Sequence, residues 1–451
     1  MYRRRFTRVA TATLLATSLV LAACGGEGGD DDTNGGAGGD TADDGGDAAD
    51  AGDGAAGDAE DVTLTVWSWR TEDEAAYQEI FAVYEEHNPH VTVEFVPYVN
   101  TDYNNILATG LTGSGGPDVA QLRAYGGLQP LVEAGQLLPL DGEVATLDRF
   151  EEEVLDGARG LEDGRIYGVP FGIQALVAFY NRGIFDELGL DEPEDWDGFI
   201  DVLDTIAASE YDPLANGGGD EWMLPIVHES VGAARYGASD FRDAVLAGER
   251  DFTDPDYVAS VELVEQLLPY MPAQAVGVDY NDSRALFTTG RAAMFLGGSF
   301  EVGFWRSDAP DLDLGAFRLP ADGGWPSGAV TPGWVDGSYG VSALSEHPDE
   351  AMALVEWMGS EEFGQLFADE INQLSAQPGI EPQDELLEQI AALYEEAPTP
   401  YLLLTDFRYG EPSGTDLIGA GMQQLMLGDS SPEEVAESLQ RGVEQWFDPQ
   451  G

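Results

Sequence analysis

The sequence predicts an α/β protein made of two lobes, and three observations support this fold class. Residues 62–67 alternate between polar and apolar side chains with the period of a β-strand. Apolar side chains between Tyr77 and Tyr84 recur at spacings of three and four, which is typical of a helix face, and residues 91–96 alternate again. This strand, helix and strand form a βαβ unit, which implies a parallel sheet. The folded part spans about 390 residues, more than one doubly wound sheet usually needs, so two lobes are predicted.

Other parts of the chain continue the α/β pattern. A glycine-rich turn at residues 115–117 leads through Asp118 into a short strand, and residues 127–135 have a helical pattern. In open sheets of this kind, ligands lie beyond the carboxyl ends of the strands, and Trp69 and Arg70 occupy that place after the first strand. Further helices are predicted at residues 198–208, 256–268, 347–369, 381–396 and 431–446.

The charge balance is strongly acidic, with 85 Asp and Glu against 19 basic residues, a net charge of -66, and no lysine. A field of this sign repels nucleic acid and anionic lipid, so neither is predicted as a partner. The acids are spread along the whole chain, as in a solubilising surface that works in high salt. We therefore interpret them as a halophilic adaptation, and we expect folding to require salt.

The amino terminus has the order of a bacterial secretion signal. Four arginines within the first eight residues precede an apolar run at 9–22, and Leu-Ala-Ala-Cys-Gly follows at 21–25. This pattern resembles a lipobox, which implies that residues 1–23 are a signal peptide and that Cys24 is lipidated. Arg3-Arg4-Arg5 also resembles a twin-arginine motif, so the export route stays open. Since Cys24 is the only cysteine, the chain can form no internal disulfide and no cysteine-based zinc site.

Residues 24–61 are predicted to form a disordered tether after the lipidated cysteine. Residues 25–61 are nearly all Gly, Asp, Ala and Glu, and such a segment cannot bury enough apolar surface to offset its ordering entropy. No later apolar run is long enough to cross a bilayer. We expect the mature protein to be anchored by lipid at the extracytoplasmic face of the bacterial cell membrane, without spanning it.

Four stretches of the chain resemble one protein family. They lie in family order across roughly residues 62–447, and together they are far more specific than any one of them. The chain resembles the extracellular solute-binding proteins of sugar ABC transporters, which are maltose-binding-protein-like. The stretches are SGGPDV at 114–119, GRIYGVPF at 164–171 with FYNRGIF at 179–185, LFTTGRAAM at 286–294 with GSF at 298–300, and YGVS at 339–342 with Glu350-Ala351 after it.

The resemblance implies a type II periplasmic-binding-protein fold with a ligand cleft between lobes joined by crossover strands. It places residues 62–172 and 318–365 in the first lobe, and 173–317 and 366–451 in the second. It also implies that the protein is the substrate-binding component of an ABC importer. It would capture a mono- or oligosaccharide and deliver it to the membrane permease. We expect a monomer with no metal and no cofactor.

A sugar site needs aromatic planes for the C–H faces of the ring and polar forks for the hydroxyl rim. Trp334 lies in a turn-rich stretch, which favours ligand stacking, whereas Asp118 suits capping of backbone amides and hydroxyl binding equally well. The sequence departs from the family at Phe300, where many members have Trp, and in its lack of Lys. The candidates in predicted loops beside the motifs are Trp69, Arg70, Asp118, Tyr125, Gln174, Trp222, Glu301, Trp305, Trp334, Asp336 and Arg408.

Two other classes of function fit the sequence less well than sugar binding. An enzyme is not predicted, because the chain has none of the common nucleophile, zinc-protease, phosphate-loop or dinucleotide motifs, and its many acids would pair by chance. A binding protein for a cationic or zwitterionic solute, such as a polyamine or a compatible solute, stays an alternative, since an aromatic cage with carboxylates would bind a cation.

Overall fold

The fold is known from a computed structural model that describes residues 60–449 and contains one nine-stranded sheet, in the order β2-β1-β3-β8-β4-β6-β5. The remaining two strands lie outside this order: β7 pairs with β4, and β9 pairs with β8. The predicted signal peptide, Cys24 and nearly all of the tether lie outside the described residues. The strands are β1 (Val62–Ser68), β2 (Val91–Pro97), β3 (Val119–Arg123), β4 (Val169–Asn181), β5 (Asp212–Leu214), β6 (Ala292–Gly298), β7 (Leu314–Phe317), β8 (Thr331–Val341) and β9 (Pro398–Pro400).

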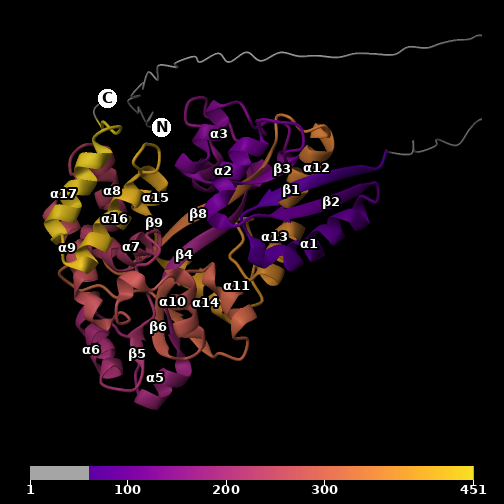
Figure 1. The fold of residues 1–451 in the computed structure, drawn as a ribbon. Coiled ribbons are helices and arrows are strands. Elements are labelled where there is room, and N and C mark those ends of the chain that lie inside the picture. Colours follow the sequence, from indigo (N-terminus) through magenta and orange to yellow (C-terminus); the bar gives the residue numbers. More distant parts are fainter. Residues whose placement is uncertain (1–59, 450–451) are drawn as a thin grey trace, which may run out of the picture. The chain divides into compact units, whose positions relative to one another are not determined.

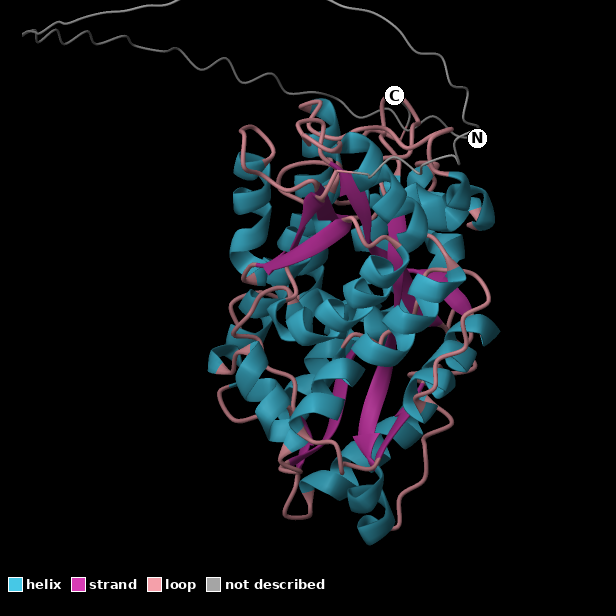
Figure 2. Cartoon of the chain, turned by 90° about the vertical axis from the view of Figure 1, so that its right-hand side faces the viewer, coloured by secondary structure: helices cyan, strands magenta, loops and turns pink. Residues whose placement is uncertain are grey.

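Helices cover the strands on both sides (Figure 2). Within the described residues, no helix combines the length and apolar character needed to cross a membrane. The helices are α1 (Glu74–His87), α2 (Asn100–Gly110), α3 (Gln129–Glu133), α4 (Glu152–Leu155), α5 (Arg182–Leu188), α6 (Trp196–Ala207), α7 (Met223–Tyr236), α8 (Ala238–Leu246), α9 (Pro255–Leu267), α10 (Tyr280–Thr288), α11 (Glu301–Asp308), α12 (Pro348–Met358), α13 (Glu361–Ile371), α14 (Glu385–Glu396), α15 (Leu402–Asp406), α16 (Gly414–Leu427) and α17 (Pro432–Val443).

The first lobe is built on the parallel strands β1, β2 and β3, with α1, α12 and α13 beside them (Figure 1). Val62 pairs with Val91, and Val66 pairs with Val119, so the predicted βαβ unit is confirmed. The apolar face of α1 is buried in a core that these elements share. The carboxyl ends of β1 and β3 therefore open on the same edge of the sheet.

The second lobe is built on β5, β6, β7 and the last part of β4. Tyr180 of β4 pairs with Met294 of β6 on one side and with Gly315 of β7 on the other. α7 is buried on nearly every side, which fits its mostly apolar sequence. Two apolar clusters fill this lobe, one around α7 and α9 and one around β6 and α11.

Three chain segments join the lobes. β4 and β8 are antiparallel from Val169, opposite Tyr339, to Ala175, opposite Gly333, with irregular register around Gly172. The third segment is residues 372–377, where Gly172 bridges to Ser375 and the Ile173 amide donates to the Leu374 carbonyl at 2.9 Å. Each lobe is therefore discontinuous in sequence.

The predicted helix at 347–369 is wrong, because two helices occupy it. α12 ends at Met358, and Ser360 caps α13 by accepting a hydrogen bond from the Phe363 amide at 3.2 Å. The break is at Gly359, where a Cβ would lie 2.2 Å from Thr146 Oγ1. The lobe boundaries stay a prediction, but the one at 365 falls inside α13. The first-lobe core extends to Ala376, which favours a later boundary.

Trp305, predicted as a ligand contact, lies instead in the core of the second lobe. Its side chain is fully buried, and its ring centroid is 4.2 Å from that of Phe179 and 4.9 Å from that of Phe287. Its indole nitrogen has no hydrogen-bond partner within residues 60–449. Trp305 was predicted to lie in a loop, but it lies on the buried face of α11. Its side chain therefore packs in the core and is not placed to contact a ligand.

Asp118 also has a structural role. One carboxylate oxygen accepts hydrogen bonds from the Thr65 amide (2.9 Å) and hydroxyl (3.1 Å), and the other accepts from the Ser345 hydroxyl (2.6 Å). It precedes β3 and therefore lies at the amino end of the strand, opposite the edge where Trp69 and Arg70 follow β1. These bonds resolve the ambiguity of the sequence in favour of capping.

We expect Trp305→Ala to lower the free energy of unfolding by about 3–5 kcal/mol, because it empties a large buried volume. Denaturant melts of the wild type and the variant measure the difference. A loss below about 1 kcal/mol would contradict the core position.

Glu229 is a buried carboxyl group in the middle of α7. Its Oε1 accepts hydrogen bonds from the Tyr236 hydroxyl at 2.7 Å and the Leu402 amide at 3.3 Å, and its Oε2 has no partner among the described residues. Burial raises the pKa of Glu229 to about 8. Between the ordinary pKa and this value, the folded protein holds a proton that the unfolded chain releases. The contribution of Glu229 to stability therefore falls as pH rises through this window.

Glu229→Gln should remove this fall, because the amide stays neutral at every pH. The melting temperature of the variant minus that of the wild type should therefore be more positive at pH 8.5 than at pH 5. Glu86→Gln, on the exposed side of α1, is the control and should leave the pH dependence unchanged. An equal pH dependence in the wild type and Glu229→Gln would show that the buried carboxyl does not carry the effect.

Candidate functional site

The loop after β1 carries the first candidates, Trp69 and Arg70. Trp69 is 3% exposed, and its ring is covered by the Arg123 guanidinium, whose carbon lies 3.9 Å from the ring centroid. Its edges pack on Tyr103 and Phe171. Trp69 is therefore a platform for Arg123, and its ring faces are not free for a ligand.

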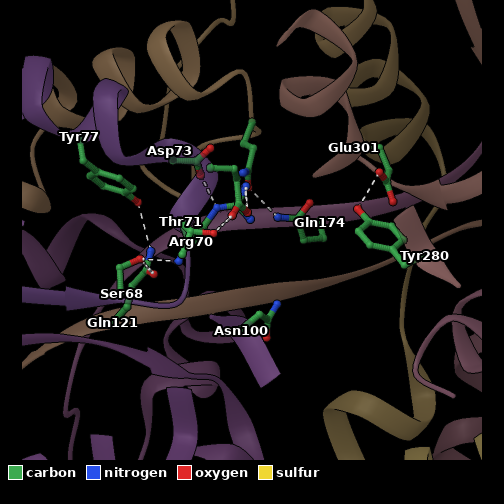
Figure 3. Close-up of polar contacts among 12 residues, drawn as sticks. Ser68, Arg70, Thr71, Asp73, Tyr77, Asn100, Gln121, Gln174, Tyr280 and Glu301 are labelled. Atoms are coloured by element: carbon green, nitrogen blue, oxygen red, sulfur yellow. Dashed lines mark hydrogen bonds and ion pairs between the residues drawn. The ribbon is translucent and has the colours of Figure 1, made fainter. Parts of the chain in front are cut away.

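Arg70 is buried and pairs with two acids of the next turn. Its guanidinium contacts the carboxylate of Asp73 and lies 3.4 Å from that of Glu72 (Figure 3). Burial opposes its charge, but Asp73, Glu72 and Asp336 together raise the pKa of Arg70 above its ordinary value. This arginine is thus held permanently charged.

A chain of amide contacts runs from Arg70 across the lobe connection. With the Gln373 amide oriented so that its oxygen faces Arg70, that oxygen accepts from Nη1 at 3.3 Å and Nη2 at 2.5 Å. Gln373 also contacts Gln174 of β4 at 3.0 Å, and the Gln174 side chain contacts the Ser299 hydroxyl at 2.7 Å. Figure 3 shows Gln174 pointing toward Arg70. The predicted residue Gln174 therefore links both lobes through Gln373, a residue that sequence reasoning missed.

Arg123, at the end of β3, was also missed. Its Nη2 donates to Asn100 Oδ1 at 2.5 Å and its Nε to Asn104 Oδ1 at 3.3 Å, so α2 holds it through neutral amides. Burial lowers the pKa of the Arg123 guanidinium to about 10. The Asp336 carboxylate opposes this shift, whereas the charges of Arg408 and Arg70 add to it. The strand-end rule that selected Trp69 would also have found Arg123 at the end of β3, which pairs with β1.

Tyr125 and Arg408 lie where the chain after β3 meets the chain after α15. Tyr125 is buried with a positive φ of 55°, and its hydroxyl accepts a hydrogen bond from the Val335 amide at 3.2 Å. Gly126 follows, and a Cβ there would lie 1.9 Å from the Arg408 carbonyl oxygen, so only glycine fits. The partly exposed Arg408 is thereby held close to the end of β3.

Aromatic side chains form a row in the second lobe. Trp222 is 44% exposed, and its ring centroid lies 6.5 Å from that of Phe300. The Phe300 centroid lies 6.5 Å from that of Trp334, which lies 5.5 Å from that of Tyr401. Trp334 is buried in this row, and Gln174 is its register partner on β4. Of the predicted tryptophans, Trp222 therefore presents the accessible face, and Trp334 supports the row from behind.

Glu301 opens α11 close to the exposed end of this aromatic row. Its carboxyl accepts a hydrogen bond from the Tyr280 hydroxyl at 2.9 Å (Figure 3). Tyr280 packs edge-on against Trp222. Burial raises the pKa of Glu301 to about 8, opposed by the Tyr280 hydrogen bond and the charges of Arg284 and Arg70. A small hollow lined by Trp222, Phe300 and Glu301 lies here.

The structure thus brings most of the predicted residues into two opposed sets of chemistry. The first set consists of arginine guanidiniums after β1, at the end of β3 and after α15, together with the Gln174 amide on β4. Asp336, on β8, belongs to this set and is partly exposed. An aromatic row comes from the second lobe. Such a combination can hold a polar ring by its hydroxyls and by its C–H face. Two predicted residues, Asp118 and Trp305, lie outside it.

A larger recess of about 550 Å³ lies elsewhere, between α13 and the start of α14. Its lining is carboxylates and amides with a single leucine, and it has no aromatic ring. Asp369 there already accepts from Gln365 and Gln383, and Asp384 pairs with Arg306. A recess without an aromatic ring offers no surface for the C–H face of a sugar, so it is not the candidate ligand site.

Comparison with known proteins agrees with the geometry. A family model described as bacterial extracellular solute-binding protein matches residues 67–365. The multiple sugar-binding protein of Streptococcus mutans is 25% identical over 310 residues, covering 66% of this chain and 71% of that relative. The maltotriose-binding protein of Pyrococcus abyssi is 26% identical over 230 residues, covering 51% of this chain and 47% of that relative.

Solved structures share the fold. One from a study of xylan utilisation by Caldanaerobius polysaccharolyticus has a TM-score of 0.73 at 25% identity, covering 84% of this chain and 99% of that one. The solute-binding protein RafE in complex with raffinose has a TM-score of 0.70 at 23% identity, covering 85% and 99%. The predicted type II periplasmic-binding-protein fold is confirmed. With the family model matching more than half of its length, this chain belongs to the bacterial extracellular solute-binding proteins.

Proposed function

We propose that this protein is the substrate-binding component of an ABC importer, which captures a carbohydrate between its lobes and delivers it to a membrane permease. The observation that carries the proposal is the pairing of an accessible aromatic row with arginine and amide groups at strand ends. A pyranose ring needs both. The names of the relatives, which bind multiple sugars and maltotriose, support the same ligand class.

Delivery to a permease needs a bound form that differs from the free form. Two antiparallel strands and one further segment connect the lobes, so a bending motion has few residues to deform. A ligand that contacts Arg123 on one side and Trp222 on the other would favour the closed arrangement by its differential affinity. The proposal includes no catalytic step, in keeping with the family.

A cationic solute is the second candidate, and the site disfavours it. Arg70, Arg123 and Arg408 lie at the site. Asp336 and Glu301 are carboxylates near these arginines without an ion pair in residues 60–449, and burial raises the pKa of Glu301 to about 8. A polyamine there would meet like charges that cost free energy. A neutral or acidic ligand would not.

We further propose that residues 1–23 are removed, that Cys24 is lipidated, and that the monomeric protein stays at the extracytoplasmic face of the membrane. The support is the order of basic region, apolar run and Leu-Ala-Ala-Cys-Gly, together with the extracellular family. Lipid acylation at a cysteine gives membrane attachment without a spanning helix.

A sugar that binds only the folded protein should raise the melting temperature, because it contributes about 2.7 kcal/mol at a hundred times its dissociation constant. Thermal shifts with mono- and oligosaccharides, polyamines and betaines measure this. Trp222→Ala should weaken sugar binding roughly 10-fold, whereas Trp357→Ala, in α12 away from the site, should not. Stabilisation by cations alone would reverse the choice between the candidates.

Cys24→Ser should move the protein from the membrane fraction to the soluble fraction of the producing bacterium, because it removes the acceptor thiol. Cell fractionation and mass spectrometry of the amino-terminal peptide measure the anchor. Membrane retention of the variant would contradict lipidation at Cys24.

A further inference from the structure

Arg123 and Arg408 differ from the other arginines of this acidic chain. Within residues 60–449 they are the two that form no ion pair. Every other described arginine has a carboxylate at ion-pair distance, as Arg242 has Asp406 at 2.6 Å and Arg306 has Asp384 at 2.6 Å. With 85 acids in the sequence, a carboxylate partner is the ordinary surrounding of an arginine here. Two arginines without one are therefore a specific feature.

These two arginines lie close together, at the proposed sugar site. Arg123 ends β3, and the backbone of Arg408 packs on Gly126, three residues farther along. The charge of Arg408 lowers the pKa of Arg123, as expected for two like charges at short range. Both side chains are partly exposed, so a ligand can reach them.

The immediate surroundings hold these charges without neutralising them. The Arg123 guanidinium lies over the Trp69 ring and donates to the neutral amides of Asn100 and Asn104. Arg408 has no hydrogen bond or ion pair in the described part of the chain. Asp336 is the carboxylate that acts most strongly on Arg123, and it also acts on Arg70. An anion bound by both guanidinium groups would reduce the electrostatic repulsion between them and would stabilise both charges.

The distant acids do not cancel this local attraction. In the salt that we expect for this protein, the screening length falls to about 3 Å at 1 M, so surface carboxylates farther away act weakly. Groups that are partly buried are screened less. The site can therefore be locally positive on a strongly negative molecule.

We propose that the bound carbohydrate carries a carboxylate, as uronic acids do, and that Arg123 and Arg408 bind this carboxylate. The inference rests on the proposed function and narrows it from carbohydrates in general to acidic ones. The planar guanidinium matches a carboxylate through two parallel hydrogen bonds. The ring of the same sugar then faces the aromatic row at Trp222 and Phe300.

Titration calorimetry on the full chain in mild detergent and high salt tests this. The probes are trigalacturonate and glucuronate oligosaccharides, each beside its methyl ester, which has the same shape without the charge. The acid forms should bind roughly 10- to 100-fold more tightly than the esters. Arg123→Gln and Arg408→Gln should each remove most of this preference by weakening the acid forms more than the esters, whereas Arg123→Lys should restore part of it.

Four results would overturn the inference. If neutral sugars bind and the acids show no preference, the ligand is a neutral carbohydrate, and the proposed function stands. If Arg123→Gln weakens acid and ester equally, Arg123 only supports Trp69 and α2. If no sugar of either kind binds, the proposed function itself fails. Binding of a carboxylate that has no sugar ring as tightly as trigalacturonate would also separate the anion site from carbohydrate recognition.

Discussion

The antiparallel pairing of β4 with β8 is the contact on which the rest of the structure depends. Each strand contributes to both lobes, because β8 lies beside β3 in the first lobe and β4 lies beside β6 and β7 in the second. Its register places Gln174 opposite Trp334, and on the other side of β8 Arg123 lies opposite Gly337. The same pairing that joins the lobes therefore brings the polar and aromatic halves of the site together.

Electrostatics gives this site its second property. Arginine is the only permanently cationic side chain in the sequence, and nearly all described arginines form ion pairs with neighbouring acids. Arg123 and Arg408 are instead held by packing and by neutral amides. An unpaired guanidinium keeps its hydrogen-bonding capacity for a ligand. On a chain with 85 acidic residues, recognition of an anion then depends on short-range, partly buried contacts rather than on long-range attraction.

Local patterns in the sequence predicted much of the fold. The βαβ unit, α6, α9, α14 and α17 follow from apolar periodicity, which is a property of neighbouring residues. The split of α12 from α13 could not be predicted in this way, because the contact of Gly359 with Thr146 joins distant parts of the chain. The two-lobed arrangement followed from the chain length and the family resemblance, not from periodicity.

The site was only partly predictable for the same reason. Trp69 and Arg70 followed from a general rule about strand ends, but the covering of Trp69 by Arg123 depends on tertiary packing. Gln373 reaches Gln174 across 199 positions of sequence, so no local signal marks it. Trp305 and Asp118 were residues of suitable chemistry beside family motifs, and their burial and hydrogen bonds give them structural roles.

The most direct test of the account is the distance between the lobes with and without ligand. Because Cys24 is the only natural cysteine, spin labels can be placed at Asn105→Cys on α2 and Asp282→Cys on α10 in a Cys24→Ser background. Pulsed electron resonance should show a shorter and narrower distance distribution when a sugar that raises the melting temperature is added. A distribution unchanged by such a sugar would contradict capture between two lobes that close about β4 and β8.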